Sequence, residues 1–293
     1  PPVDPPARVA AARGAVIIPA HDEADVIGRV LESLAPLAEQ PGLEVIVVCN
    51  GCSDGTAAVA REFDGVHVIE LDEASKPAAL NAGDRAAAAW PRLYLDADVE
   101  ISPPVAVLDV FEALSEPGVL AARARYVYDT SGATAPCART TVPAAESPPR
   151  RPHGCGGPAA TPRTSRVMRS SGVFPPTVTA DDSWFDEQFG EHEKRVVATH
   201  PMRVRTPRDA AGLLAVLTRQ RRGYVELGIP SSAGSRGRAL LATVKGPRSV
   251  IDALWYVAFT ARSRLRAEEI LRRSADRQWE RDASSRTKTG TAR

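Results

Sequence analysis

The chain has 293 residues, of which 43% are hydrophobic and 25% are charged, so it can form one large domain or two small ones. A formal net charge of +1 gives no indication of a nucleic-acid partner. The charge is unevenly spread, because residues 231–293 hold 14 Lys/Arg and 6 Asp/Glu, a net of +8, which leaves −7 for the rest. A basic C-terminal region could bind an anionic membrane surface. The alternative is that these charges lie on a solvent-exposed helix face and in a disordered tail.

Cysteine content and apolar runs limit the class of protein further. Four cysteines do not suggest a disulfide scaffold at this length. Cys49 and Cys52 form a C-x-x-C pair without a matching second pair, so a structural zinc site is not expected. Residues 1–13 lack the apolar segment of a signal peptide, and the run from Val250 to Phe259 is too short to span a bilayer. We therefore expect a cytoplasmic protein whose membrane contact, if any, is peripheral and at the inner face.

The first hundred residues alternate between short apolar runs and helical patterns. Continuous apolar runs of this length are typical of buried parallel strands, and strand–helix alternation indicates an α/β sheet with right-handed crossovers. Asp22 is expected to cap the first helix. The predicted strands are 15–19, 43–48, 66–71 and 92–95.

Polar residues follow two of these strands. Asp96 and Asp98 come directly after the fourth strand, and alternate residues of a strand share one face. The carboxyl ends of parallel strands form the edge where ligands bind, and two carboxylates there repel each other unless a cation or a hydroxyl-rich ligand lies between them. Asn50 ends the second strand, where its amide can bind a base or a sugar hydroxyl. The alternative is that Asp96 and Asp98 form a polar turn closing a strand.

Four motifs together carry a resemblance to a known family. They resemble family 2 glycosyltransferases in order and in spacing: Pro19–Glu23, Asn50–Thr56, Lys76–Gly83 and Asp96–Asp98. The resemblance covers about residues 15–129. It implies a GT-A fold, here a Rossmann-like mixed sheet flanked by helices, with a nucleotide-diphosphate sugar as donor and Mn²⁺ or Mg²⁺ as cofactor. Asn50 stands where the family often has Asp, which leaves the identity of the base open.

The resemblance also implies residue roles in the donor half. Asp98 and Asp96 are expected to bind the metal. The residues expected to contact the donor are Pro19, Ala20, His21, Glu23, Asn50, Lys76 and Asp96.

Two later motifs match the catalytic half of the same family. Asp181 and Asp182 resemble its acidic pair, with Asp182 as the candidate general base; the alternative is a pair of charges favoured at a helix N-terminus. Gln220, Arg221 and Arg222 resemble its Gln/Arg-rich motif over the diphosphate. Gln220 and Arg221 are expected to contact the donor, and Arg222 the departing diphosphate. The Arg guanidinium can donate two parallel hydrogen bonds to phosphate oxygens. A solvated basic helix end is the alternative.

The segment from Ala133 to Gly172 differs from the rest of the chain. It has no Leu, Ile, Phe, Tyr or Trp, and burying its few aliphatic side chains does not offset ~1–2 kcal/mol of backbone entropy per ordered residue. We expect it to be poorly ordered and to pack against nothing apolar. Three interpretations stay open: a real insert, a degraded segment, or a local reading-frame error.

The C-terminal part is expected to be helical and basic. Two helices are predicted, from Val250 to Phe259 and from Leu265 to Trp279; the second either packs on the domain or lies at a membrane interface. The expected organisation is a tail (1–13), a GT-A domain (14–230), a basic helical region (231–283) and a tail (284–293).

The function expected from the resemblance is inverting, metal-dependent glycosyl transfer with Asp182 as the general base. The acceptor is a glycan, a lipid-linked sugar or a small molecule, in the synthesis of a cell-envelope polysaccharide or glycolipid. The alternative is a catalytically impaired nucleotide-sugar-binding protein that lacks an intact acceptor site.

Overall fold

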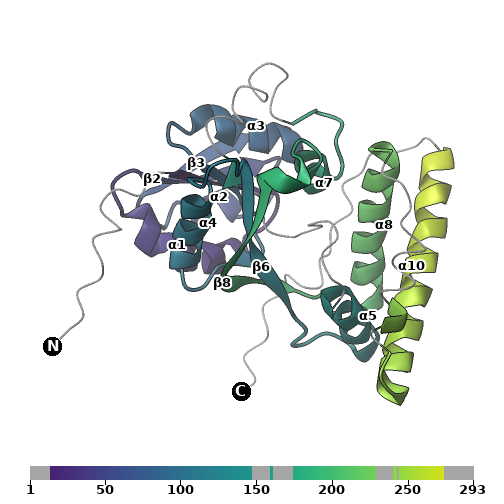
Figure 1. Cartoon of the computed structure of the whole chain (residues 1–293). Helices are drawn as coiled ribbons and strands as arrows, with labels where there is room; N and C mark the ends of the chain where they lie inside the picture. Colours follow the sequence, from purple (N-terminus) through teal and green to yellow (C-terminus); the bar gives the residue numbers. More distant parts are fainter. Residues whose placement is uncertain (1–13, 147–158, 161–173, 229–239, 243, 274–293) are drawn as a thin grey trace, which may run out of the picture. The chain divides into compact units, whose positions relative to one another are not determined.

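The computed structural model describes residues 14–146, 159–160, 174–228, 240–242 and 244–273 (Figure 1). Contacts within the chain divide it into two compact units. The first comprises Pro1–Tyr126, Cys155–Pro176 and Phe185–Met202, and the second comprises Val127–Gly154, Thr177–Trp184 and Arg203–Arg293. The domain boundaries expected from the sequence remain predictions.

Four parallel strands form one half of the sheet, in the order β3-β2-β1-β4. All seven residues of β1 are buried, which explains why the strand reads as one continuous apolar run. Ile17 in the middle of β1 pairs with Ile46 on one side and Tyr94 on the other. The predicted parallel sheet is confirmed, with strands β1 (Gly14–Ala20), β2 (Leu43–Asn50), β3 (Val66–Leu71) and β4 (Arg92–Tyr94).

Four further strands complete an eight-stranded mixed sheet, as expected for the fold class. The order continues from β4 as β7-β6-β8-β5, and β7 is antiparallel to both β4 and β6. Strand β8 is the longest of the four, with 12 residues. The bounds are β5 (Val99–Glu100), β6 (Ala121–Asp129), β7 (Ala159–Ala160) and β8 (Lys194–Arg205).

Helices cover both faces of the parallel half. Right-handed crossovers place α1 on one face and α3 on the other, as Figure 1 shows. Gly83 of α3 lies so close to the sheet that an added Cβ would be 2.4 Å from Ile17 Cγ2, so a residue without a side chain is needed there. The bounds are α1 (Ile27–Ala38), α2 (Thr56–Ala60), α3 (Lys76–Ala86) and α4 (Val105–Ala113).

The prediction that Asp22 caps the first helix is wrong. Helix α1 begins after Val26, which makes no side-chain cap. Asp22 instead has a positive φ of 50°, a conformation that Asp tolerates better than most residues, and its carboxylate binds Ser53. The loop after β1 therefore turns back toward the loop after β2 instead of running straight into the helix.

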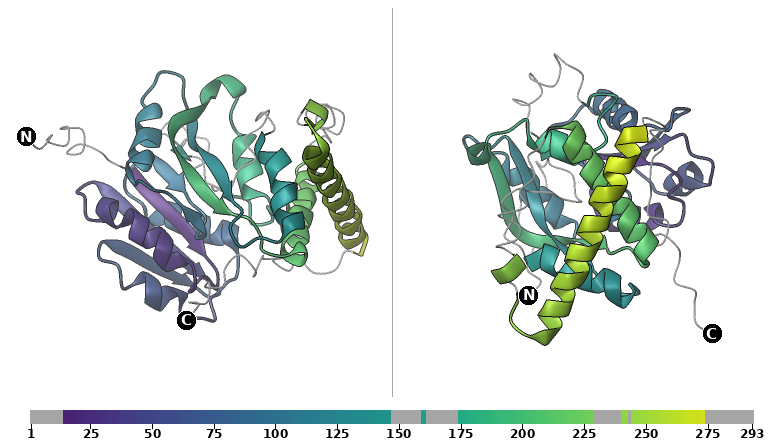
Figure 2. Two further views of the ribbon diagram at one scale, coloured as in Figure 1. Left: turned by 90° about the horizontal axis from the view of Figure 1, so that it is seen from below. Right: turned by 90° about the vertical axis from the view of Figure 1, so that its right-hand side faces the viewer.

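Three helices of the second unit pack against one another: α5 (Ala135–Glu146), α8 (Ala210–Glu226) and α10 (Pro247–Arg273), seen side by side in Figures 1 and 2. Helix α5 corrects the expectation for 133–172, because its first part is helical and packed. Cys137 is fully buried, and Arg139 forms an ion pair of 2.7 Å with Asp252 of α10. Thr140 is also buried, so the described side chains of α5 include small ones that are inaccessible to solvent. Residues 147–158 and 161–173 lie outside the described residues.

The two predicted C-terminal helices are one continuous helix, α10. The sequence between them, residues 260–264, holds Ser263 and two Arg residues. Arg is a good helix former, and the Ser263 hydroxyl donates to the Thr260 carbonyl, 2.9 Å away, within the same helix. The part of the second predicted helix beyond Arg273 lies outside the described residues.

Candidate functional site

The loops after β1 and β2 are bound to each other at the carboxyl edge of the sheet, in the first unit. His21 Nδ1 lies 2.6 Å from the carbonyl oxygen of Asn50, and Asn50 Nδ2 donates to the carbonyl of Ala20 over 2.8 Å. Ala20 and Asn50 are buried, whereas His21 is half-buried. These two contacts hold the backbone of both predicted donor motifs in one place.

A second set of contacts extends the same junction. Asp22 Oδ1 accepts a hydrogen bond of 2.6 Å from the Ser53 amide, and Asp54 Oδ2 accepts one of 3.1 Å from the Ala24 amide. The amide of buried Glu23 donates to Thr56 Oγ1 over 2.7 Å. Each carboxylate thus crosses from one loop to the other, so the motifs Pro19–Glu23 and Asn50–Thr56 form a single structural unit.

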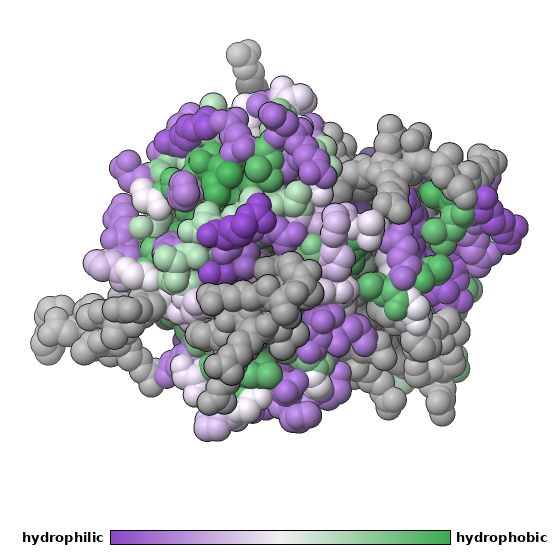
Figure 3. Space-filling view, turned by 90° about the horizontal axis from the view of Figure 1, so that it is seen from above, coloured by the Kyte–Doolittle hydropathy of each residue, from purple (hydrophilic) through white to green (hydrophobic). Residues whose placement is uncertain are grey.

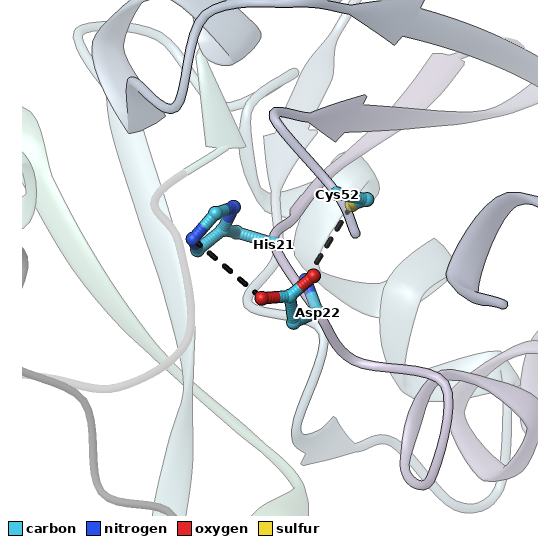
Figure 4. A group of neighbouring side chains, drawn as sticks. All are labelled: His21, Asp22 and Cys52. Atoms are coloured by element: carbon cyan, nitrogen blue, oxygen red, sulfur yellow. Dashed lines mark hydrogen bonds and ion pairs between the residues drawn. The ribbon is translucent and has the colours of Figure 1, made fainter. Parts of the chain in front are cut away.

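His21, Asp22 and Cys52 come together within this junction, as Figure 4 shows. One possible ligand atom from each lies within 4.8 Å of the others. The Asp22 amide donates to Cys52 Sγ over 3.4 Å, and His21 Nε2 lies 4.0 Å from Asp22 Oδ2. Burial raises the pKa of Cys52, and burial raises the pKa of neighbouring Cys49 to about 12, so both thiols are held protonated at neutral pH.

The third part of the edge follows β4. Lys76, the first residue of α3, places its Nζ 2.7 Å from Asp96 Oδ1. Asp98 is half-buried two residues further on, before β5. The start of α3 is fixed by Ser75, whose hydroxyl accepts a hydrogen bond of 3.3 Å from the Ala78 amide. The structure therefore brings the predicted residues Lys76 and Asp96 into direct contact.

The donor set at the end of β4 fits a divalent metal. Asp96 and Asp98 supply carboxylate oxygens, which Mg²⁺ and Mn²⁺ favour, and Lys76 offsets part of the negative charge on Asp96. In the described part of the chain, the one group of three or more His, Cys, Asp or Glu ligands is His21, Asp22 and Cys52. A metal at Asp98 would therefore need ligands from outside the protein, as is usual when a metal bridges substrate phosphates.

The second unit contains the predicted acidic pair. Asp181 and Asp182 occupy the first turn of α7 (Asp181–Asp186), and both are half-buried. Asp182 Oδ1 accepts a hydrogen bond of 2.7 Å from the Ser183 amide. Ala180, the residue before the pair, is buried.

Helix α8 packs directly on the segment that leads into this pair. A Cβ added to Gly223 would lie 2.3 Å from the Cβ of Ala180 and 3.1 Å from its amide nitrogen. The motif containing Gln220, Arg221 and Arg222 is thus next to the acidic pair within the second unit. Gln220 and Arg221 are half-buried on α8.

Arg222 has an unusual environment for a charged residue. It is 7% exposed, and its Nε is buried without a hydrogen-bond partner among the described residues. A buried guanidinium without a full set of partners is costly, so such a site is stabilised when an anion binds. The Arg222 Nε could take a phosphate oxygen as its partner, although the Nε of buried Arg123 is in the same situation.

The predicted site residues thus fall into two groups. The first unit contains Pro19, Ala20, His21, Glu23, Asn50, Lys76, Asp96 and Asp98; the second contains Asp181, Asp182, Gln220, Arg221 and Arg222. His200, which lies on β8, is exposed.

Two sets of residues in the first unit were not singled out from the sequence. Asp22 and Cys52 lie inside the quoted motifs, but neither was assigned to the donor site. Asn81 was also missed: its amide forms two hydrogen bonds of 2.8 Å with the backbone of Phe174. The separation of 93 residues between these partners gives no signal in a single sequence.

Comparison with known proteins identifies a family match over part of the chain and a shared fold. Residues 15–154 match the family described as Glycosyl transferase family 2. The structure is similar to mannosyltransferase PcManGT from Pyrobaculum calidifontis, solved with GDP-Man and Mn²⁺, at a TM-score of 0.59 and 20% identity over 87% of each chain. No protein in the curated set is similar enough in sequence to count as a match.

Two mycobacterial structures also share the fold. Glucosyl-3-phosphoglycerate synthase from Mycobacterium tuberculosis, solved with Mn²⁺, UDP-glucose and phosphoglyceric acid, gives a TM-score of 0.52 and 21% identity over 77% of this chain and 83% of that one. A structure described as a mycobacterial protein gives 0.52 and 24% over 77% and 78%. Residues 15–154 therefore carry the domain of glycosyl transferase family 2, and the chain has the GT-A fold of these solved structures.

Proposed function

We propose that the protein transfers a sugar from a nucleotide-diphosphate donor to an acceptor hydroxyl, with a divalent metal and with inversion at the anomeric carbon. The observation that carries this proposal is the gathering of three loops at the carboxyl edge of the sheet. There the Lys76–Asp96 pair and Asp98 follow β4, and the joined loops of His21 and Asn50 follow β1 and β2. Solved proteins of the same fold hold GDP-Man with Mn²⁺ and UDP-glucose with Mn²⁺, which supports a donor of this class.

In this proposal the loop junction binds the nucleoside. Its buried backbone is fixed before the ligand arrives, so less entropy is lost on binding. Asp96 and Asp98 would hold the metal, which would neutralise charge on the departing diphosphate. Lys76 holds Asp96 in position. The remaining contacts to the donor are assigned to Pro19, Ala20, Glu23, Gln220 and Arg221.

The second unit supplies the proposed chemistry at the sugar. Asp182 accepts the proton of the acceptor hydroxyl while that oxygen attacks the anomeric carbon from the face opposite the diphosphate. The bond from the anomeric carbon to the diphosphate oxygen breaks, and its electron pair leaves with that oxygen. The products are the nucleoside diphosphate and the acceptor carrying the sugar with inverted anomeric configuration. Arg222 donates to the departing diphosphate, which would give its buried Nε a partner. Asp181 lies beside Asp182 in the first turn of α7 and is assigned to the same catalytic group.

Metal-dependent nucleotide binding tests this proposal. The melting temperature of the protein is measured with UDP-glucose or GDP-mannose, in Mn²⁺, Mg²⁺ or EDTA. A ligand at 100 times its Kd stabilises the native state by about 2.7 kcal/mol, so a donor that binds raises the melting temperature. We expect the rise for at least one donor with metal and not with EDTA, and we expect Asp98→Ala to abolish it.

The matched control is Asp64→Ala, which removes an exposed carboxylate before β3, at the opposite edge of the parallel strands. It should keep the metal-dependent rise, and circular dichroism should show that both variants are folded. An Asp98→Ala variant with an unchanged response to metal and donor would contradict the assignment of Asp98.

A further inference from the structure

Helix α10 has a broad apolar face that is exposed in the structure. Its members are Val250, Ile251, Leu254, Trp255, Val257 and Leu265, called the α10 face below. Leu254 and Leu265 are each 64% exposed, which is high for leucine. Their spacing of three, four and seven residues places them along one side of the helix over about four turns.

The other side of α10 is the one that packs within the second unit. Asp252 pairs with Arg139 of α5, and Ser263 and Ala267 are buried. The α10 face is therefore not needed to hold the three helices together. Figure 3 shows green apolar residues among purple hydrophilic ones at its right-hand side.

Basic residues border the α10 face. Arg248 and Arg262 lie seven residues before and seven after Trp255, so all three share one side of the helix, and both arginines are exposed. Residues 244–273 hold seven Lys/Arg and three Asp/Glu, a net charge of +4. An apolar strip with an aromatic residue and flanking arginines is the pattern of helices that lie in a membrane interface.

We propose that the α10 face docks onto an anionic lipid surface, with the helix lying in the plane of the interface. Charge favours lipid over a second copy of the chain, because pairing two α10 faces brings arginines of the same sign together, whereas anionic headgroups complement them. No helix in the described part of the chain is long and apolar enough to cross a membrane. Exposed Glu268 and Glu269 follow Leu265, so the lipid contact ends there.

Vesicle binding by the full chain tests this proposal, without nucleotide or sugar, so its outcome is independent of the proposed catalysis. Cosedimentation is measured with vesicles of phosphatidylcholine alone and with about one-third phosphatidylglycerol. We expect binding to the anionic vesicles that weakens with salt. The double variant Leu254→Asp/Leu265→Asp should bind at least tenfold more weakly. Arg248→Ala and Arg262→Ala should each lower binding by about fivefold.

Two controls separate docking from general damage. Val196→Asp places the same charge at a similarly exposed apolar position, 42% exposed on β8, and should bind as wild type does. Trp255→Phe keeps an apolar ring, so it should still bind, but the blue shift of tryptophan fluorescence on adding vesicles should be lost.

Equal binding by wild type and Leu254→Asp/Leu265→Asp would overturn the proposal. So would an unchanged blue shift in Trp255→Phe, or failure of the wild type to bind anionic vesicles. Light scattering is measured in parallel: a dimer that Leu254→Asp/Leu265→Asp dissociates would show that the face joins two copies, and the lipid proposal would then be wrong.

Discussion

Behind the carboxylates that follow β4 lies a buried polar network. The Tyr94 hydroxyl donates to Asp84 Oδ1 over 2.8 Å, and Asp84 is also in contact with the guanidinium of buried Arg92. Burial, followed by the nearby Asp84 carboxylate, raises the pKa of Tyr94 well above its usual value. The ring of Tyr94 packs edge-on against Phe174 and Phe185, with centroids 5.2 and 5.6 Å away. This network fixes the strand that delivers Asp96 and Asp98.

Replacing Tyr94 with Phe should have an effect on stability that depends on pH. Near pH 7 the variant loses a hydrogen bond to a charged group, which costs about 1.5–3 kcal/mol. Above about pH 10 the unfolded wild type loses its Tyr94 proton while the folded form keeps it, so the wild type loses stability as pH rises. The variant has no such proton. The stability difference should therefore shrink by up to about 1.4 kcal/mol per pH unit above pH 10.

Urea unfolding of both proteins at pH 7, 9, 10 and 11 measures this difference. Other groups that titrate at alkaline pH are common to both proteins and cancel in the comparison. A difference that stays constant from pH 7 to 11 would show that Tyr94 is not held protonated by the fold.

At the scale of elements, the contact between α8 and the segment before α7 determines where Arg222 lies relative to Asp182. Gly223 permits this contact, because any side chain there would meet Ala180. Arg222 precedes Gly223, and Asp181 and Asp182 follow Ala180. The close approach thus sets the separation between the proposed base and the proposed diphosphate ligand.

Gly223→Ala should weaken both stability and transfer. Its Cβ would lie 2.3 Å from the Ala180 Cβ, so α8 or the Ala180 segment has to move. Overpacking of this kind costs typically 1–3 kcal/mol, or several degrees in melting temperature for a domain of this size. Gly246→Ala is the control, since an added Cβ there meets nothing within 4 Å. A Gly223→Ala protein as stable and as active as Gly246→Ala would contradict the packing described for α8.

The sequence predicted the parallel strands and α1 well, because buried strands and amphipathic helices leave a direct periodic signal. It failed where packing depends on small residues or on partners distant in the chain. Helix α5 was missed because Ala, Thr and Cys carry little apolar signal, yet they pack well against α10. The prediction of two separate C-terminal helices was wrong, because the polar residues between them continue one helix that packs against α5 and α8.

The candidate site likewise has a part that could be predicted and a part that could not. The motifs indicated the residues at each strand end, because each motif follows a predicted strand directly in the sequence. The Lys76–Asp96 pair, the Asn81–Phe174 hydrogen bonds and the positive φ of Asp22 arise only when separate segments meet. Contacts between segments far apart in the chain cannot be predicted from a single sequence.

At the scale of the whole molecule, the proposed chemistry depends on both compact units. Asp98 and the loops of His21 and Asn50 belong to the first, whereas Asp182 and Arg222 belong to the second. Strands β6 and β8 each run from one unit into the other, so the chain connects the two at several points. A binding protein would need only the first unit's residues, whereas a transferase needs both groups.

The anomeric configuration of the sugar released from an α-linked donor therefore tests the central claim most directly. Incubated with Mn²⁺ and a donor that binds, the protein should transfer the sugar slowly to water, and proton NMR follows the first product before mutarotation. We expect the β anomer first, and we expect Asp182→Asn to release sugar about 10²–10⁴ times more slowly with nearly unchanged donor affinity. Release of the α anomer first, binding of donor without any release, or an Asp182→Asn rate equal to wild type would contradict inverting transfer with Asp182 as the base.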